Sequence, residues 1–221
     1  MTDRQVAGSP DSPLPADAFR RLDETPDAAF YATPRFVTHI DDGAIAAVTQ
    51  LYREHLPAGG AVLDLMSSWV SHLPPDIPYR RVIGLGMNAD ELAANPRLDG
   101  WVVHDLNAEP RLPFADGEFD GATCCVSIDY LVQPVAVLRD LVRVLRPGAP
   151  LLVTFSNRRF PTKVIAKWEA LDDAGRAQLV GQYLREAGGW DDVVALDRSP
   201  ERGDPLFAIV ARRAGSKMSA A

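Results

Sequence analysis

The chain has 221 residues, of which 47% are hydrophobic and 24% charged, and its 30 acidic side chains outnumber 23 basic ones to give a formal net charge of −7. A chain of this length and hydrophobicity is expected to form one domain with its own buried core. The acidic balance disfavours nucleic acid as a partner, because affinity for a polyphosphate comes from many Lys and Arg side chains.

The N-terminus and the cysteines bear on the compartment. The first residues are polar and rich in proline, whereas a secretory signal needs a basic start and an apolar stretch, and no run of about 18 apolar residues could span a membrane. Cys124 and Cys125 are neighbours in a predicted strand, so their side chains point to opposite faces and are badly placed for a disulfide. We therefore expect a reduced, cytoplasmic protein.

The N-terminal part divides into an arm and a cap. Residues 1–26 contain four prolines among Asp and Ser and show no hydrophobic period, which predicts a disordered or loosely packed arm. Between 41 and 56 apolar residues recur at intervals of three and four, as in an amphipathic helix capped by Asp41 or Asp42. Residues 27–60 are expected to form an N-terminal helical cap.

Beyond residue 60, short apolar runs alternate with helix-prone segments. This alternation indicates an α/β fold: a Rossmann-like, seven-stranded, mostly parallel sheet with helices on both faces. The single domain then covers 27–213, with its α/β core at 61–213 and a flexible tail at 214–221. The predicted strands are 61–65, 81–85, 101–104, 119–126, 151–155, 193–196 and 206–211, and the predicted helices are 89–94, 135–145 and 162–187, the last with a break near 172–175.

The first motif is VLDLMSSWVSHLP, at 62–74, which places Asp64 at the end of the first core strand. Ligands bind at the carboxyl ends of the strands in such a sheet. A carboxylate there can stabilise a cationic ligand, and the small residues Ser67 and Ser68 let backbone N–H groups approach it. The plainer interpretation is an aspartate that caps the turn after a strand.

The second motif offers a different cofactor. Gly84, Gly86 and Ala89 form G-x-G-x-x-A after a strand, and Asp105 follows about 20 residues later, as in a dinucleotide fingerprint. This spacing supports a nicotinamide-dependent, NAD(P)-using oxidoreductase. A strong strand already precedes the motif, however, and the chain has no evident catalytic Tyr–Lys pair at helical spacing.

The third motif runs over residues 104–157. It contains L-P-F-x-D-x-x-F-D at 112–120 and a helix that ends in R-V-L-R-P-G at 143–148, followed by another strand. This ordered set closely resembles the class I S-adenosylmethionine-dependent methyltransferases that act on small molecules (type 11-like), and the resemblance covers about 60–213. The first motif departs from that family, because Met66 and Val70 stand where glycines or small residues are usual.

The resemblance implies S-adenosylmethionine as the cofactor and no metal. The residues implied to contact it are Asp64, Met66, Ser67 and Ser68 at the methionyl part, Gly86, Met87 and Asn88 near the ribose, Asp105 and Leu106 near the adenine, and Val126 and Ser127 beside the sulfonium. The second strand ends without the acid that the family normally offers to the ribose, and the nearest polar residues are Asn88, Asp90 and Glu91.

Methyl transfer from a sulfonium is an in-line displacement that needs alignment and, for a weakly acidic nucleophile, a base. The candidate catalytic residues are Asp129, Tyr130 and His39, although Asp129 equally suits a helix cap and His39 a partly buried structural position. The candidate substrate-binding residues are Tyr31, Arg35, Asn157 and Arg158, although hydrophobic anchoring of the arm explains Tyr31 as well.

A local basic cluster bears on the acceptor. Arg158, Arg159 and Lys163 stand close together in an acidic chain, which suggests an anionic acceptor, although a solvated loop explains them equally. The leading hypothesis is a methyltransferase acting on a small-molecule acceptor, for which the cluster favours an anionic one, with neither nucleic acid nor membrane as a partner. The alternatives are a catalytically inactive methyltransferase-fold binding protein, which the altered glycine loop and missing ribose acid would explain, and an NAD(P)-dependent oxidoreductase.

Overall fold

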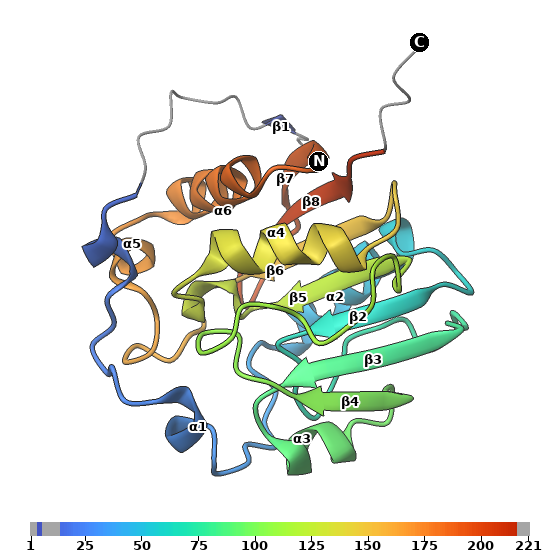
Figure 1. Ribbon diagram of the computed structural model, residues 1–221, viewed down its shortest axis with the longest axis horizontal. Coiled ribbons are helices and arrows are strands. Elements are labelled where there is room, and N and C mark those ends of the chain that lie inside the picture. Colours follow the sequence, from blue (N-terminus) through green and yellow to red (C-terminus); the bar gives the residue numbers. More distant parts are fainter. Residues whose placement is uncertain (1–3, 6–13, 216–221) are drawn as a thin grey trace.

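The computed structural model describes residues 4–5 and 14–215, and these form a sheet with helices on both of its faces (Figure 1). The strands are β1 (Arg4–Gln5), β2 (Ala61–Leu65), β3 (Arg81–Gly86), β4 (Gly100–Val103), β5 (Gly121–Cys125), β6 (Pro150–Phe155), β7 (Trp190–Asp197) and β8 (Phe207–Arg213). The α-helices are α1 (Asp27–Phe30), α2 (Asp42–His55), α3 (Ala89–Ala94), α4 (Pro134–Val144), α5 (Ala166–Glu169) and α6 (Asp173–Ala187), and the 3-10 helices are η1 (Ala16–Phe19) and η2 (Ile128–Tyr130).

The sheet confirms the predicted α/β architecture. Its strand order is β1-β7-β8-β6-β5-β2-β3-β4, in which the seven predicted strands are joined by the two-residue β1 at one edge. The strands β4, β3, β2, β5 and β6 are parallel, whereas β8 is antiparallel to β6 and to β7. The chain leaves β2 toward β3 on one side and reaches β5 on the other. Neighbouring connections therefore diverge between β2 and β5, where open sheets of this kind bind ligands.

Two hydrophobic clusters pack on the two faces of the sheet. Leu138 and Leu141 of α4 and Leu179 and Leu184 of α6 belong to the first cluster. The second cluster contains Val48 and Leu51 of α2, which lies behind the sheet in Figure 1. The helix α2 begins after Asp41, whose carboxylate accepts a hydrogen bond from Ala44 N at 2.9 Å, so the predicted cap is confirmed.

The two adjacent cysteines face opposite sides of the sheet, as predicted. Cys124 is buried in the first cluster, whereas Cys125 packs against the second. Burial raises the pKa of the Cys125 thiol to about 11, and it raises that of Cys124 further. Both side chains are therefore protonated, apolar packing groups at neutral pH.

Residues 14–26, predicted as part of a loose arm, pack against the domain instead. Ala18 is buried, and the Phe19 ring lies 6.2 Å from that of Tyr183 in α6. The ammonium group of Lys163 is fully buried and lies 3.2 Å from Asp27 and 3.3 Å from Asp23. The remainder of the predicted arm, at 1–3 and 6–13, and the tail at 216–221 lie outside the described residues.

The connection between β2 and β3, residues 66–80, contains no helix. It includes Pro74, Pro75 and Pro78, which do not suit a helix interior. Among the other parallel crossovers, the one between β3 and β4 contains α3 and the one between β5 and β6 contains α4, whereas the one between β4 and β5 contains no helix. The loop 66–80 therefore reaches the ligand-binding end of the sheet as irregular backbone.

The third motif builds scaffold rather than a site. The Arg143 guanidinium of α4 donates hydrogen bonds to the carbonyl oxygens of Leu112 and Phe114, at 2.9 and 2.6 Å, and to Asp116 and Asp140. Asp120 accepts a hydrogen bond from Ala61 N at 2.8 Å, which ties the segment before β5 to the start of β2. These contacts explain the residue order of the motif by packing.

Candidate functional site

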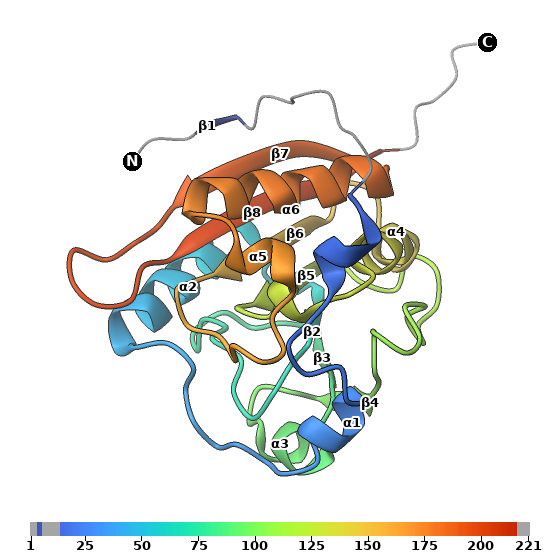
Figure 2. The ribbon, with the colours of Figure 1, turned by 90° about the vertical axis from the view of Figure 1, so that its left-hand side faces the viewer.

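A cavity of about 340 Å³ lies at the carboxyl ends of β2, β3, β4 and β5. That volume is within the range of about 300 to 1,000 Å³ that small-molecule sites occupy. Segment 14–41, which includes α1, passes in front of this end of the sheet before it enters α2 (Figure 2). The cavity is therefore enclosed by strand ends on one side and by the N-terminal cap on the other.

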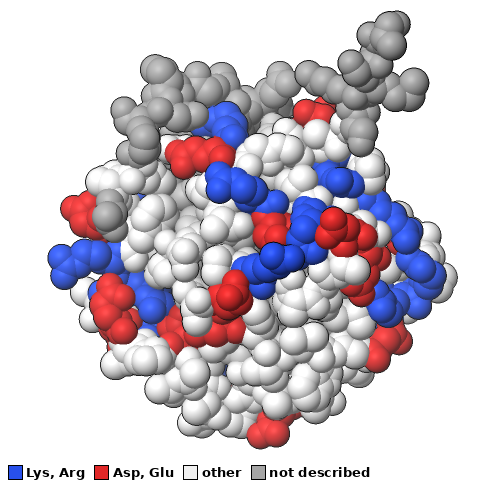
Figure 3. All heavy atoms as spheres, in the orientation of Figure 1, with Lys and Arg blue, Asp and Glu red and all other residues white. Residues whose placement is uncertain are grey.

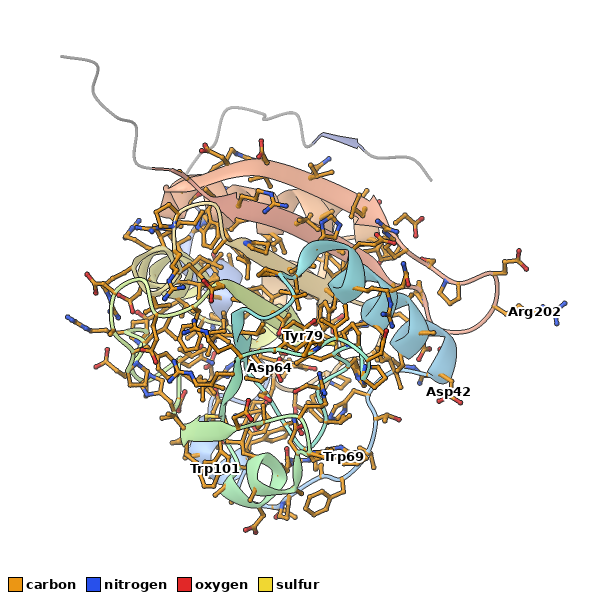
Figure 4. All side chains as sticks on the ribbon, turned by 90° about the vertical axis from the view of Figure 1, so that its right-hand side faces the viewer. Asp42, Asp64, Trp69, Tyr79, Trp101 and Arg202 are labelled. Carbon is orange, nitrogen blue, oxygen red and sulfur yellow. The ribbon has the colours of Figure 1, made fainter. Side chains whose placement is uncertain are left out.

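Asp64 is the centre of a hydroxyl network at the end of β2. It lies between Gly84 of β3 and Thr123 of β5 in the sheet. One carboxylate oxygen accepts hydrogen bonds from Ser67 Oγ at 2.6 Å and Ser71 Oγ at 2.5 Å, and the other from Thr123 Oγ1 at 2.8 Å. Burial raises the pKa of Asp64, which lies in the interior in Figure 4, while the three hydroxyl donors oppose that rise. These bonds fix the loop 66–72 along the cavity.

Two residues with side chains have left-handed backbone at the strand ends that meet here. Met66, directly after β2, has φ +56°, and Val126, directly after β5, has φ +43°. A left-handed conformation costs an L residue about 1–2 kcal/mol and is least favourable for a β-branched one. Both residues line the cavity. Strained backbone held by the surrounding structure is a feature of functional sites.

Close packing at the end of β3 depends on Gly86. A Cβ atom there would lie 2.2 Å from the carbonyl oxygen of Ser67, so β3 and the loop after β2 can approach only because residue 86 is glycine. Gly86 itself is not part of the cavity lining, whereas its neighbours Met87 and Asn88 are.

Asn88 joins the cap to the core. Its amide nitrogen donates to the carbonyl oxygens of Tyr31 at 2.9 Å and Ala32 at 3.2 Å, and its oxygen caps α3 by accepting from Asp90 N and Glu91 N. Its polar atoms are thus used by the protein, so the predicted role of Asn88 at the ribose becomes one of positioning.

Glu91 is a buried carboxylate that makes the same connection from the first turn of α3. It accepts hydrogen bonds from Arg35 N at 2.7 Å and Ser68 Oγ at 2.6 Å, and so ties the cap to the loop after β2. The chain also joins these two segments through Trp69, whose indole donates to the carbonyl oxygen of Val37 at 2.9 Å. The sequence marked Glu91 only as an acid near a strand end and gave no sign of Trp69.

The end of β4 supplies a turn and an apolar wall. Asp105 accepts hydrogen bonds from the backbone N–H groups of Asn107 and Ala108, and Leu106 is buried against the cavity. The side chain of Asn107 donates to Asp27 at 2.8 Å and to the carbonyl oxygen of Tyr130 at 2.9 Å. At the end of β5, Ser127 also lines the cavity.

Aromatic rings surround a cation on the cap side. The Arg35 guanidinium lies 4.5 Å from the centroid of the Phe30 ring, 5.8 Å from that of Tyr31 and 5.4 Å from that of Phe160. It donates to the carbonyl oxygens of Phe30 and Thr33, and no carboxylate in the described part of the chain pairs with it. Burial raises the pKa of the Tyr31 hydroxyl, which therefore remains neutral beside this cation.

The predicted catalytic residues separate into two groups. His39 and Tyr130 line the cavity, and Tyr130 Oη accepts a hydrogen bond from Phe160 N at 2.8 Å. Asp129 does not: it is 3% exposed and lies behind the cavity wall, where burial raises its pKa to about 7. A carboxyl group that does not reach the cavity cannot contact a substrate there.

The predicted basic cluster is not a free cationic surface. Arg158 forms an ion pair with Asp204 at 2.8 Å, Arg159 with Glu169, and Lys163 with Asp23 and Asp27. Arg158 and Arg159 line the cavity, but Asn157 is exposed outside it. The partners of Arg158 and Lys163 come from segments far away in the sequence, and that of Arg159 lies 10 residues further on, so a count of charges within the cluster does not include them.

Two cavity imidazoles lack hydrogen-bond partners among the described residues. Burial lowers the pKa of His39 and of His72, so both rings are neutral at pH 7, and neither ring makes a hydrogen bond to any residue that the structure describes. His104, at the end of β4, instead has its Nε2 2.8 Å from the carbonyl oxygen of Glu109. His72 was not among the predicted site residues, although it lies within the first motif.

Membrane-spanning helices and metal clusters are both absent from the part of the chain that the structure describes. No helix within 4–5 and 14–215 is long and apolar enough to cross a membrane. Among these same residues, no group of three His, Cys, Asp or Glu side chains converges to hold a metal ion.

Comparisons with known proteins agree on the nature of the domain. Residues 67–153 match the family model described as "Methyltransferase domain". A demethylmenaquinone methyltransferase of Beutenbergia cavernae is 43% identical over 86 residues, which are 39% of this chain and 32% of that protein. A ubiquinone/menaquinone biosynthesis C-methyltransferase of Roseobacter denitrificans is 42% identical over 65 residues, or 29% of this chain and 24% of that protein. The matched part thus spans about a third or less of these curated relatives.

Solved structures extend the likeness to most of the chain. The cyclase SpnF has a TM-score of 0.61 at 19% identity, over 86% of this chain and 91% of that one. A methyltransferase of Aquifex aeolicus that depends on S-adenosylmethionine has a TM-score of 0.56 at 17% identity, over 78% of this chain and 92% of that one. At such identities the likeness shows the fold, which proteins of different activities share.

Proposed function

We propose that the chain is a class I S-adenosylmethionine-dependent methyltransferase, which residues 67–153 resemble in sequence and most of the chain resembles in fold, and that it transfers a methyl group from this cofactor to a small-molecule acceptor. The observation that carries the proposal is the 340 Å³ cavity at the carboxyl ends of β2 to β5, closed by the cap. The strained backbone of Met66 and Val126 at this place adds support.

The residues of the cavity fit the cofactor. Asp64 offers a carboxylate to the ammonium of its amino-acid end, while Met87 and Leu106 offer apolar contact to its nucleoside. The hydrogen bonds of Ser67 and Ser71 to Asp64 fix the loop 66–72 along the cavity, at the place where the family has a glycine-rich turn. The end of β3 remains without a carboxylate for the ribose.

When bound, S-adenosylmethionine supplies an electrophilic methyl group. The chain must then orient the acceptor, exclude water and take up the proton that the acceptor loses. We propose that His39 takes up this proton, because its ring lines the cavity, is neutral and makes no hydrogen bond to the described residues. Tyr130 is protonated and holds Phe160 N, so we assign it a positioning role.

The acceptor that suits the cap side is a planar ring with an acidic hydroxyl group. Arg35 would stabilise the oxyanion, since a guanidinium with no carboxylate partner attracts an anion, and the rings of Tyr31 and Phe160 would pack on the acceptor. The curated relatives bear the names of methyltransferases for demethylmenaquinone and for ubiquinone biosynthesis, which are compatible with such an acceptor.

The test is transfer of isotope-labelled methyl from S-adenosylmethionine to a set of hydroxylated benzoquinols and naphthoquinols. We expect labelled product in at least one case, with equimolar S-adenosylhomocysteine. Arg35→Met should reduce the rate of methyl transfer about 10- to 100-fold, which corresponds to the loss of one charge-assisted hydrogen bond. Arg35→Lys should retain part of the activity. Equal rates for wild type and Arg35→Met would contradict the role of Arg35.

A second candidate is a methyltransferase-fold protein that binds the cofactor without transferring methyl. The missing carboxylate at the end of β3 and the full use of Asn88 by the protein favour it. Tight binding of S-adenosylhomocysteine together with no label transfer across the acceptor set would select this alternative.

A further inference from the structure

The Asp64 end of the cavity lacks a feature that commonly binds anions. After the first strand of a ligand-binding α/β sheet, a helix N-terminus presents backbone N–H groups to an anionic group. In this chain the segment after β2, residues 66–80, has no helix. A carboxylate that binds beside Asp64 is therefore not met by a helix N-terminus in this chain.

His72 lies within this helix-free segment, and both of its neighbours are fixed. Ser71 donates to Asp64 and accepts from the Asn95 amide at 3.0 Å, while Leu73 is buried in the second hydrophobic cluster. The ring of His72 lines the cavity and makes no hydrogen bond to any described residue. Its position is set by its neighbours, and its donor is left for a ligand.

The cationic side chains that line the cavity are engaged with other groups, which leaves the ring of His72 as a donor beside Asp64. Asp64 of β2 and His39 of the cap are the titratable groups that act on it, and the oxygens of Asp64 already accept three hydroxyl donors. The guanidinium groups of Arg158 and Arg159 are engaged with carboxylates, and that of Arg35 is surrounded by aromatic rings on the cap side. The charged groups that act on the pKa of His39 are Glu91, which raises it, and Arg35, which lowers it.

We propose that His72 binds the carboxylate of the amino-acid end of the methyl donor, in place of the helix N-terminus that this segment lacks. Asp64 then faces the ammonium of the same zwitterion, so the two side chains match its two charges. The inference rests on the proposed function, because it requires the donor to occupy the cavity.

Proton uptake follows from this arrangement. A bound carboxylate raises the pKa of His72, which burial holds below the ordinary value of 6.5 in the free protein. Affinity for the ligand is then greatest below the pKa of the free ring, and it falls as pH rises through the pKa of the bound ring. A ligand without the carboxylate lacks this dependence.

The experiment compares two ligands that differ by the amino-acid end. S-adenosylhomocysteine has this end and methylthioadenosine does not, and both are titrated calorimetrically into the full chain between pH 5.5 and 8. We expect His72→Asn to weaken the binding of S-adenosylhomocysteine about 10- to 100-fold and to leave the affinity for methylthioadenosine nearly unchanged. His55→Asn, a substitution at the far end of α2, is the matched control and should change neither affinity.

The outcomes are distinct. If His72→Asn reduces the affinity for both ligands equally, or for neither, the assignment of His72 is overturned. If the variant does not fold, the wild type alone decides: S-adenosylhomocysteine must lose affinity with rising pH while methylthioadenosine does not, and parallel profiles would overturn the inference. Binding of neither ligand to the wild type would refute the proposed function together with this inference.

Discussion

At the scale of single residues, the cavity is formed by groups whose bonds are already fixed. Asp64, Glu91 and Asn88 each use their polar atoms on loop or cap partners, and so they position the walls of the cavity. Asp64 also lines the cavity and can accept a further donor there, and the other groups left for a ligand are the imidazoles of His39 and His72 and the guanidinium of Arg35. This division places positioning in the core and contact with ligand in the cap and the loop after β2.

Gly86 and Gly84 provide a matched test of the close approach at β3. A Cβ at residue 86 would meet the backbone of Ser67 at 2.2 Å, whereas at residue 84 it would meet the flexible end of the Leu98 side chain at 2.5 Å. We expect Gly86→Ala to lower the free energy of unfolding by about 2 kcal/mol or more, and Gly84→Ala to cost less, because a side-chain end can move. Urea denaturation of both variants measures the difference. Equal losses would show that the Ser67 contact is not decisive.

Asp129 makes stability depend on pH. Its pKa is raised from 3.8 to about 7 by burial, so the folded state holds this proton more tightly than the unfolded state does. Stability from this group is present below pH 4 and is lost as pH rises from about 4 to 7, by up to about 1.4 kcal/mol per pH unit. Asp129→Asn cannot ionise, so its stability relative to wild type should increase from pH 4.5 to pH 8 in urea denaturation. A difference that stays constant over this range would contradict the assignment.

At the scale of elements, the segment before α2 makes polar contacts with the core, in addition to the apolar packing of α2 itself. Asn88, Glu91 and Trp69 bond to the backbone of this segment, and Lys163 bonds to the carbonyl oxygens of Asp23 and Thr25, at 3.2 and 2.6 Å. The fully buried Lys163 also pairs with Asp27, which lines the cavity. Segment 14–27 is thereby linked to the site.

Lys163→Met tests this attachment. Removing one partner of a buried ion pair leaves Asp23 and Asp27 with fewer donors, so we expect a loss of about 3 kcal/mol in the free energy of unfolding. The substitution should speed up amide hydrogen exchange in residues 18–31 more than it speeds up exchange in β2 and β5. Lys167→Ala, on the neighbouring helix α5, is the control and should change neither quantity. Unaltered exchange in 18–31 on Lys163→Met would show that the attachment lies elsewhere.

The elements themselves were largely readable from the sequence. The predicted strand 61–65 is β2 residue for residue, and the predicted helix 89–94 is α3, because both have clear hydrophobic patterns and local end signals. The packing of residues 14–26 was not readable, since Lys163 and its partners are about 140 residues apart. The helix-free loop 66–80 and the unpartnered ring of His72 likewise depend on tertiary contacts that no local pattern records.

At the scale of the whole molecule, the residues that carry the family resemblance and those that form the site are separate. The third motif, which carries the resemblance, ties α4 to the segment before β5 through Arg143. The cavity instead depends on β2, α3 and the cap. On the face shown in Figure 3, Lys and Arg side chains lie beside Asp and Glu side chains, so the net charge of −7 does not produce a surface of one sign there.

The most direct test of the central claim is calorimetric titration of S-adenosylhomocysteine into wild type and Asp64→Ala, with nicotinamide dinucleotides titrated in parallel. The cavity at the end of β2 predicts that wild type binds S-adenosylhomocysteine and that Asp64→Ala, which removes the acceptor of Ser67 and Ser71 in the loop and of Thr123 in β5, binds it at least about tenfold more weakly. Binding of the nicotinamide dinucleotides alone, or an S-adenosylhomocysteine affinity unchanged by Asp64→Ala, would contradict it.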